Sequence, residues 1–287
     1  MKPVSRSVEQ KTNMLGFPKP SEFIEMTGVH TLEASDRAIF NVLYQLAHDS
    51  GKIMDPAAEW EVSLATLRQS FSRHESTDRI RDSLERLRSV NATVRYLDDV
   101  GQTRVVLTHL FDFFDIPERE MSGRQTLRFG LPRKILPVIR VSGRWGRIKA
   151  EIVCAMTSKY AIALYEMVQL RSGLEKCIET VGIDRFRDLV GVPPGQYDRI
   201  DNLMSKVVTP AVMQVNGLSD MSVLIEGRRK HARASVDRFD IAWWRKSQEE
   251  MEAAIRERNR SKVGRMARLK GAVETVAPRA ALSMPGD

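Results

Sequence analysis

Apolar and polar residues in the first third of the chain follow helical spacing, interrupted by one short alternating stretch. In residues 35–48 the apolar side chains recur at i, i+3, i+4 and i+7, which predicts an amphipathic helix with Ser35 as its N-cap. The alternation around Trp60 predicts a short strand, and residues 64–71 predict a brief helix after it. These elements would form a small helical layer with one strand beside it.

The following residues continue with a basic helix and a hairpin. Helical spacing over residues 76–90 predicts a helix with Ser76 or Thr77 as its cap. Residues 92–97 and 103–110 are prone to form strands, and the DDVGQ sequence between them suits a hairpin turn. Helix, strand, helix, basic helix and hairpin, in this order, predict a helix-turn-helix with a β-hairpin appended, which is the winged-helix arrangement.

The second half of the chain repeats this order. We expect a helix over residues 157–170, capped by Thr157 or Ser158, and a possible strand at 177–180. A short helix follows at 183–190, and the sequence GVPP after it is a strong stop signal. The repetition indicates a second unit of the same kind.

A long apolar stripe over residues 198–216 predicts the third helix of this second unit. Pro210 should kink that helix, because proline removes a backbone donor and clashes with the preceding turn. Strand-forming residues resume at Met221 and lead to the basic sequence GRRKHAR, which we place at the tip of a hairpin. The densest positive charge of the chain therefore falls on the wing of the second unit.

The remaining segments show little periodicity. Residues 1–28 predict a tail or a loosely docked arm, and residues 111–146 an irregular bridge. Residues 245–270 hold nine Arg or Lys against four Glu, which fits either a basic helix lying along DNA or a solvated tail. Both readings of the C-terminal segment stay open at this stage.

The pattern predicts an α+β fold with two tandem winged-helix domains and flexible basic tails. We expect an N-terminal arm at 1–28, a first winged-helix domain at 29–140, a second at 145–245 and a basic C-terminal tail at 246–287.

Composition narrows the choice of partner. The 287 residues carry a formal net charge of +8, which favours nucleic acid as a partner, with an anionic membrane surface second. No stretch approaches the roughly 18 consecutive apolar residues of a membrane span, and the first residues lack the apolar run of a signal peptide. We therefore expect no membrane partner. Cys154 and Cys177 show no CxxC spacing and predict buried, reduced thiols in a cytoplasmic protein.

Double-stranded DNA is the polyanion that two winged helices would bind, because one helix fits the major groove and the wing reaches neighbouring phosphates. The basic wing could also be an ordinary solvated turn or a localisation patch, but its place after a helix-turn-helix pattern favours DNA contact. The candidate contacts are Arg79, Arg81 and Arg86 in the first unit, and Arg199, Asn202, Ser205, Lys206, Arg228, Arg229, Lys230 and Arg233 in the second.

Three motifs in the second unit resemble a known family, the iteron-binding plasmid replication initiators of the RepA and RepE type. SKYAIALYEMV is similar to its Ser-x-Tyr-x-x-x-Leu-Tyr-Glu helix. FRDLVGVPPGQY is similar to its Leu-Arg-x-x-Leu-Gly-Val segment, with Phe186 in place of the leucine. KVVTPAVMQVNGLSD is similar to its Pro-Ala-x-x-x-Ile-Asn helix, with Gln214 where many members carry Glu. The similarity is strong over residues 155–241 and weaker over 30–118.

The resemblance implies a function beyond DNA binding. Such proteins bind directly repeated origin sites (iterons), help open adjacent A·T-rich DNA and recruit a host DnaA-type initiator and the replicative helicase. Monomers usually initiate, and dimers repress the initiator's own promoter. The first domain would carry the dimer contact and a secondary DNA contact, and the second domain the main DNA contact, in the bacterial cytoplasm.

Enzyme classes find little support in the residues. The five histidines are isolated, so the paired-histidine metal site of a rolling-circle nuclease is missing, and no GxxxxGK[ST] phosphate loop or zinc-type Cys/His cluster occurs. We expect no catalytic residue, no metal and no cofactor. A winged-helix transcription regulator without a replication role is the alternative function.

Overall fold

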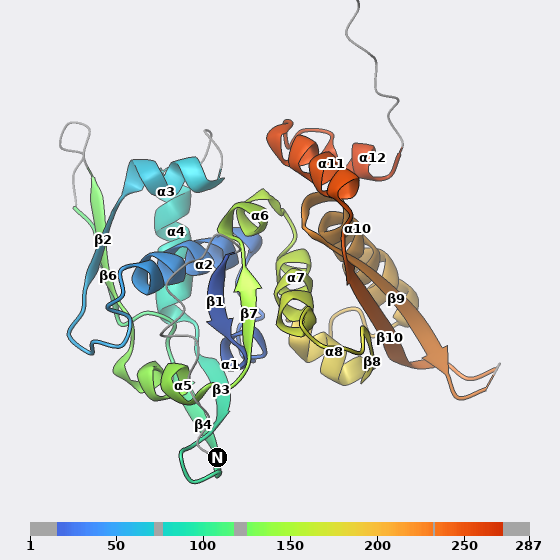
Figure 1. The fold of residues 1–287 in the computed structure, drawn as a ribbon, viewed down its shortest axis with the longest axis horizontal. Coiled ribbons are helices and arrows are strands. Elements are labelled where there is room, and N and C mark those ends of the chain that lie inside the picture. Colours follow the sequence, from blue (N-terminus) through green and yellow to red (C-terminus); the bar gives the residue numbers. More distant parts are fainter. Residues whose placement is uncertain (1–15, 72–76, 118–124, 232, 272–287) are drawn as a thin grey trace, which may run out of the picture.

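The computed structural model describes residues 16–71, 77–117, 125–231 and 233–271, which form two units side by side (Figure 1). The elements of the first unit are β1 (Phe17–Pro20), α1 (Ser21–Ile24), α2 (Ala34–Asp49), β2 (Trp60–Ser63), α3 (Leu64–Phe71), α4 (Thr77–Ser89), β3 (Ala92–Leu97), β4 (Thr103–Thr108), β5 (Phe113–Asp115), β6 (Thr126–Gly130), η1 (Arg133–Ile135), α5 (Leu136–Val141), β7 (Trp145–Ile148) and α6 (Ala150–Ala155). The second unit continues with α7 (Lys159–Arg171), β8 (Ile178–Gly182), α8 (Ile183–Val190), α9 (Ile200–Leu203), the π-helical segment η2 (Met204–Val208), α10 (Thr209–Leu218), β9 (Met221–Arg229), β10 (Val236–Arg245), α11 (Gln248–Asn259) and α12 (Arg265–Leu269).

The predicted order of elements in the first unit is confirmed, with one error at a helix start. The β3–β4 hairpin closes over a turn in which the Asp98 carboxylate accepts from the backbone N–H groups of Val100 and Gln102, at 3.1 and 2.8 Å. Helix α2 is not capped by Ser35, which lies inside its first turn. Its N-cap is Glu33, in a reciprocal capping box with Asp36. The alternative cap Ser76 lies outside the described residues.

Two segments that we expected to be irregular are ordered parts of the first unit. β1 pairs antiparallel with β7, and Phe17 within it is fully buried, so residues 16–28 are not a loosely docked arm. The segment 111–146 is not an irregular bridge, because β5 and β6 extend β2 into a three-stranded sheet. These strands are three to five residues long, too short to show a clear alternation in the sequence.

The second unit has the predicted winged-helix order. Ser158 caps α7 through its side chain, and Gly191 ends α8 in the left-handed conformation at φ 75°. A three-stranded sheet, in the order β8-β10-β9, carries the long hairpin. Its inner face packs Trp243 and Phe239 into the core, where Phe239 contacts Phe186 of α8 edge-to-face.

The long third helix is continuous from α9 through η2 to α10, but its hydrogen-bond pattern changes in the middle. The π-helical turns of η2 end directly before α10, where Pro210 occupies the first turn. Proline has no N–H to donate, and a π-type insertion places it where none is needed. The predicted kink at Pro210 stays a prediction, and the structure shows a π-helical segment directly before it. The predicted apolar stripe is buried at Leu203, Val207 and Val215.

The segment that follows the wing is not a solvated tail. α11 and α12 pack back onto α10, and Arg265 of α12 is only 3% exposed. The predicted flexible tail is thus wrong for residues 246–271. No helix among the described residues is long and apolar enough to cross a membrane.

The thiols differ from each other. Cys154 is buried, and burial raises the pKa of its thiol to about 12, so it stays protonated. Cys177 is exposed, which corrects the expectation that both thiols are buried.

Helix α7 lies at the seam between the units and is buried on all sides from Ala161 to Arg171. It packs on α1, α2 and β7 of the first unit and on α8 and α10 of the second. Glu166 of α7 accepts from Lys19 Nζ of β1 at 2.7 Å and from Asn41 Nδ2 of α2 at 2.8 Å. This buried polar cluster joins both units.

Candidate nucleic-acid interface

The wing of the second unit is the β9–β10 hairpin, which extends away from the body (Figure 1). One residue before the end of β9, the Arg228 guanidinium donates to the Asp240 carboxylate, which raises the pKa of Arg228. Asp240 also accepts from the Thr180 hydroxyl at 2.7 Å, and these two hydrogen bonds lower the pKa of its carboxyl. Arg228 is thus partly engaged within the sheet.

The cations nearer the tip of the wing are all exposed. They are Arg229, Lys230 and Arg233. Because a hairpin tip contacts the protein body so little, these side chains keep the freedom to reach phosphates on either side of a groove. The tip of the wing is therefore an exposed cationic surface, and Arg228 beside it is paired with Asp240.

The third helix presents a polar face opposite its buried stripe. Arg199 is the N-cap of α9, and its side chain is 81% exposed, 3.9 Å from Asp201. Asn202, Ser205 and Lys206 are exposed on the first turns after it. Arginine and asparagine are the residues that most often read guanine and adenine in the major groove. The four predicted residues of this helix thus form one accessible surface.

The turn before α9 is held by a residue that the sequence analysis missed. The guanidinium of Arg187 on α8 donates to the backbone carbonyls of Gln196 at 2.8 Å, Tyr197 at 2.6 Å and Asp198 at 3.1 Å. Tyr197 has φ 57°, a conformation that is strained for a tyrosine. Arg187 therefore fixes the loop that presents Arg199. The FRDLVGV motif contains it, but spacing alone gives no sign of a partner ten residues away.

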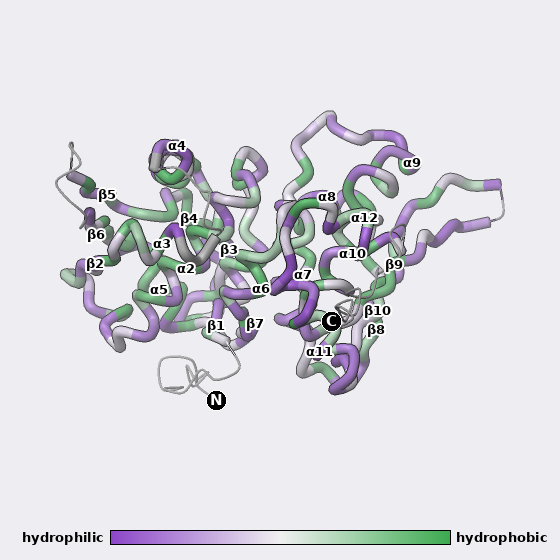
Figure 2. The backbone as a smooth tube through the Cα atoms, turned by 90° about the horizontal axis from the view of Figure 1, so that it is seen from above, coloured by the Kyte–Doolittle hydropathy of each residue, from purple (hydrophilic) through white to green (hydrophobic). Residues whose placement is uncertain are grey.

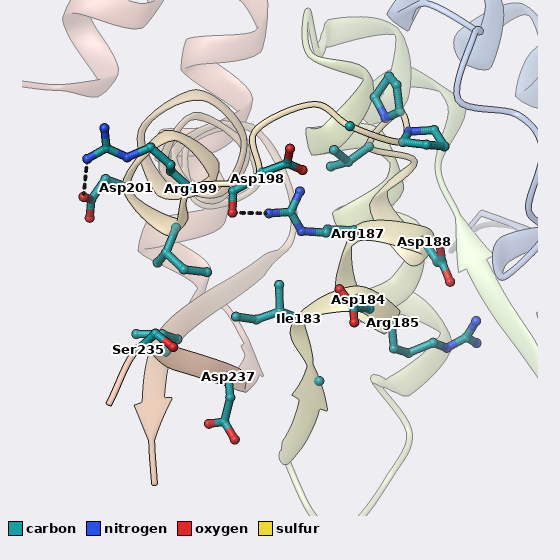
Figure 3. A pocket seen from close by; sticks show the side chains of 17 residues that line it. Ile183, Asp184, Arg185, Arg187, Asp188, Asp198, Arg199, Asp201, Ser235 and Asp237 are labelled. Carbon is teal, nitrogen blue, oxygen red and sulfur yellow. Dashed lines mark hydrogen bonds and ion pairs between the residues drawn. The ribbon is translucent and has the colours of Figure 1, made fainter. Parts of the chain in front are cut away.

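A groove of about 960 Å³ lies between this turn and the wing (Figure 3). Its lining mixes arginines with the carboxylates of Asp184, Asp188, Asp198, Asp201 and Asp237. Carboxylates repel a phosphate, so the centre of the groove is poorly suited to phosphate contacts.

The candidate residues of the first unit have different surroundings. Arg79 of α4 is exposed. Arg81 donates to the Pro117 carbonyl at 3.1 Å. Arg86 forms a two-point pair with Asp36 of α2, at 2.8 and 2.9 Å, and this hydrogen-bonded pair raises the pKa of its guanidinium. Its Nε and Nη2 donors thus serve the packing of α4 on α2. Arg88, which was not among the candidates, is exposed on the same helix.

The two candidate surfaces lie on the same side of the molecule. In Figure 2, α4 and α9 both lie toward the upper edge, one in each unit, and the wing projects beside α9. Among the described residues, no group of three His, Cys, Asp or Glu side chains is placed to hold a metal ion. The arrangement can contact an extended polyanion at two places and at the wing.

Comparisons with known proteins find similarity over most of the chain. The sequence model described as "Initiator Replication protein, WH1" matches residues 18–169, and the one described as "Initiator Rep protein, WH2" matches residues 182–243. A crystal structure of the Pi initiator protein in complex with iteron DNA is similar at a TM-score of 0.62 and 11% identity, over 83% of this chain and 99% of that chain. A structure of domains 2 and 3 of RctB matches at a TM-score of 0.45 and 10% identity, over 75% of this chain and 83% of that chain. No curated protein gives a significant match.

Proposed function

The chain belongs to the initiator Rep protein family, and we propose that it starts plasmid replication by binding repeated origin sites through α9 and the wing of its second unit. The observation that carries the proposal is the accessible face of Arg199, Asn202, Ser205 and Lys206 beside the exposed cations of the wing. A Pi initiator of similar fold has been crystallised with iteron DNA, which supports duplex DNA as the partner. We place the protein in the bacterial cytoplasm, where such origins reside.

Binding free energy and recruited proteins would open the origin, without nucleotide hydrolysis by this chain. Distorting a site costs on the order of 1–6 kcal/mol, which several copies on adjacent repeats can supply. The resemblance of the sequence to iteron-binding initiators supports recruitment of a host DnaA-type initiator and the replicative helicase. A transcription regulator would share the DNA-binding surfaces but would leave an A·T-rich segment closed.

We expect purified protein, without nucleotide or metal, to make thymines in an A·T-rich segment beside its repeats reactive to permanganate. The same DNA with scrambled repeats is the control. Binding to the repeats without thymine reactivity, together with failure to sustain a plasmid, would favour the regulator. Metal-dependent nicking of supercoiled DNA would overturn the non-enzymatic reading.

We expect the two units to bind one DNA site together. Because α4 and α9 lie toward the same side, we expect them to enter successive major grooves, about 10 bp apart. Hydroxyl-radical footprinting of a single repeat should show protection over roughly two turns on one face of the DNA. Protection of only a single turn by the intact protein would exclude binding of both units to one site.

We also propose that the first unit carries the contact between two copies, at the outer edge of β4. β4 pairs only with β3 among the described elements, and Val105 and Leu107 on its outward face are 54% and 75% exposed. An exposed apolar edge strand is suited to antiparallel pairing with a second copy. Such a dimer would bind an inverted repeat at the promoter.

Replacing Val105 and Leu107 with lysine should shift the protein toward the monomer in sedimentation velocity, because like charges would then face each other across the pair. Binding to a single iteron should be unchanged. The matched control is Leu174→Lys with Ile255→Lys, which makes the same chemical change at two exposed apolar residues away from β4. An unaltered monomer–dimer equilibrium in the first variant would move the contact elsewhere.

A further inference from the structure

The segment 246–271, which we call the C-terminal clasp, lies outside both matched family regions and yet is folded against both units. It contains α11 and α12, visible in red at the top of Figure 1. Its first residue, Lys246, and its last helix are attached to different elements of the body. One attachment is to α10 of the second unit, and the other is to α6 of the first unit.

The clasp holds the end of the DNA-facing helix through its cations. Lys246 Nζ donates to the carbonyls of Asn216 and Ser219, the second at 2.9 Å, and Arg258 donates to the Leu218 carbonyl at 2.7 Å. These carbonyls are at the C-terminus of α10, where acceptors lack helical partners and the helix dipole is negative. Cations placed there fix the end of the helix that begins at α9.

The other end of the clasp holds the first unit. Lys262 donates to the Cys154 carbonyl at 3.1 Å and Arg265 to the Ala155 carbonyl at 2.8 Å, at the C-terminus of α6. Helix α6 packs on α2 and α3. The buried guanidinium of Arg265 also donates to the carbonyls of Glu257, Arg258 and Arg260, at 3.0–3.1 Å, so it joins α6 to α11 at one point.

Between these two attachments lies the turn from α6 to α7. Gln214 of α10 accepts from the backbone N–H groups of Thr157 at 2.8 Å and Ser158 at 3.3 Å, and its amide lies 3.7 Å from the Met266 sulfur of α12. The side chain of Leu269 packs directly on Gly217, where a Cβ would lie 2.2 Å from it. The clasp therefore covers the corner at which the two units meet.

We propose that the C-terminal clasp determines which spacing between half-sites the protein accepts, by fixing the angle between the α4 and α9 surfaces. This inference rests on the proposed binding of both units to one DNA site. Two rigidly joined binding units tolerate only one separation and rotation of their targets, whereas loosely joined units tolerate several. A clasp that ties α10 to α6 is placed to supply this rigidity.

The test measures the ratio of affinities for a natural repeat and for the same repeat with 2 bp inserted between its half-sites. The insertion rotates one half-site by roughly 70° relative to the other. We expect the full-length protein to bind the inserted site about 100-fold more weakly, because one unit can no longer contact its half-site. Arg265→Met and, separately, Arg258→Met should lose only about tenfold, since each frees one end of the clasp.

Arg256→Met is the matched control, because Arg256 is an exposed cation on the same α11 and pairs only with Glu252 of that helix among the described residues. Its spacing ratio should equal that of the unaltered protein. Far-UV circular dichroism and the melting temperature report whether each variant keeps its fold.

The possible results separate the clasp proposal from the proposed function. Equal ratios in all four proteins would overturn the clasp proposal while leaving DNA binding in place. Failure of the unaltered protein to bind any repeat would instead overturn the proposed function. Weaker binding of the variants to both sites by the same factor, with an unchanged ratio, would also reject a role for the clasp in spacing.

Discussion

Lys19→Met should destabilise the protein by about 3–5 kcal/mol, since it removes the cation that is hydrogen-bonded to the buried Glu166 carboxylate. Lys19 and Glu166 are 1% and 3% exposed, and their 2.7 Å ion pair crosses from β1 to α7. Asn41 continues to donate to Glu166 in this variant, but a neutral amide cannot balance the charge. The melting temperature should fall by on the order of 10 °C in calorimetry.

A second variant separates the charge effect from packing. Lys19→Met combined with Glu166→Leu removes both charges, and we expect it to recover at least half of the lost stability. Lys52→Met is the control, because Lys52 is exposed in a loop of the same unit. A loss below about 1 kcal/mol for Lys19→Met would show that water or a neighbouring cation takes over the role of the lysine.

Replacing Arg229, Lys230 and Arg233 with alanine should weaken binding to every DNA sequence by about 100-fold at 0.15 M salt, if each contacts one phosphate. The slope of log affinity against log salt should fall by about 2.7, that is, about 0.9 for each lost contact. Arg228 is left unchanged, because its pair with Asp240 belongs to the sheet. Fluorescence anisotropy at four salt concentrations measures both quantities.

The matched control removes the same charge from another surface. Arg133, Lys134 and Arg140 are exposed on η1 and α5, away from the upper edge of Figure 2 that holds α4 and α9. Their replacement by alanine changes the net charge equally, so a similar loss of affinity would show that only the overall charge matters. In contrast to the wing variant, Arg199→Ala should cost roughly 1–3 kcal/mol on the natural site alone.

The elements that the sequence predicted well are those with long periodic patterns. The stripe of the α9–α10 helix and the charged wing could be assigned because many residues repeat one spacing. The strands β1, β5 and β7 could not, because they are three or four residues long and their partners are distant in sequence. Pairing between residues 17–20 and 145–148 leaves no local trace.

In the candidate site, residue spacing predicts which side chains are exposed but not which partners they bind. The exposed positions of Arg199 and Lys206 follow from the polar side of an amphipathic helix. The ion pair between Arg86 and Asp36 cannot be predicted in this way. A cation on a helix face gives the same sequence pattern whether it faces solvent or a carboxylate of another helix. The basic composition of residues 245–270 was misleading for the same reason: several of its cations, including Arg258 and Arg265, donate to backbone carbonyls at helix ends.

The pairing of β1 with β7 has a consequence for the chain while the ribosome is still making it. Phe17 and its partner Ile148 are 131 positions apart (148 − 17), so on the order of ten seconds of synthesis pass between them. During that interval Phe17 and its neighbours have no strand to join, and the first unit cannot close its core. A gene fragment that stops at residue 140 would release the same unfinished product permanently, whereas one that extends through Arg171 would encode every strand and helix that encloses the N-terminal strand.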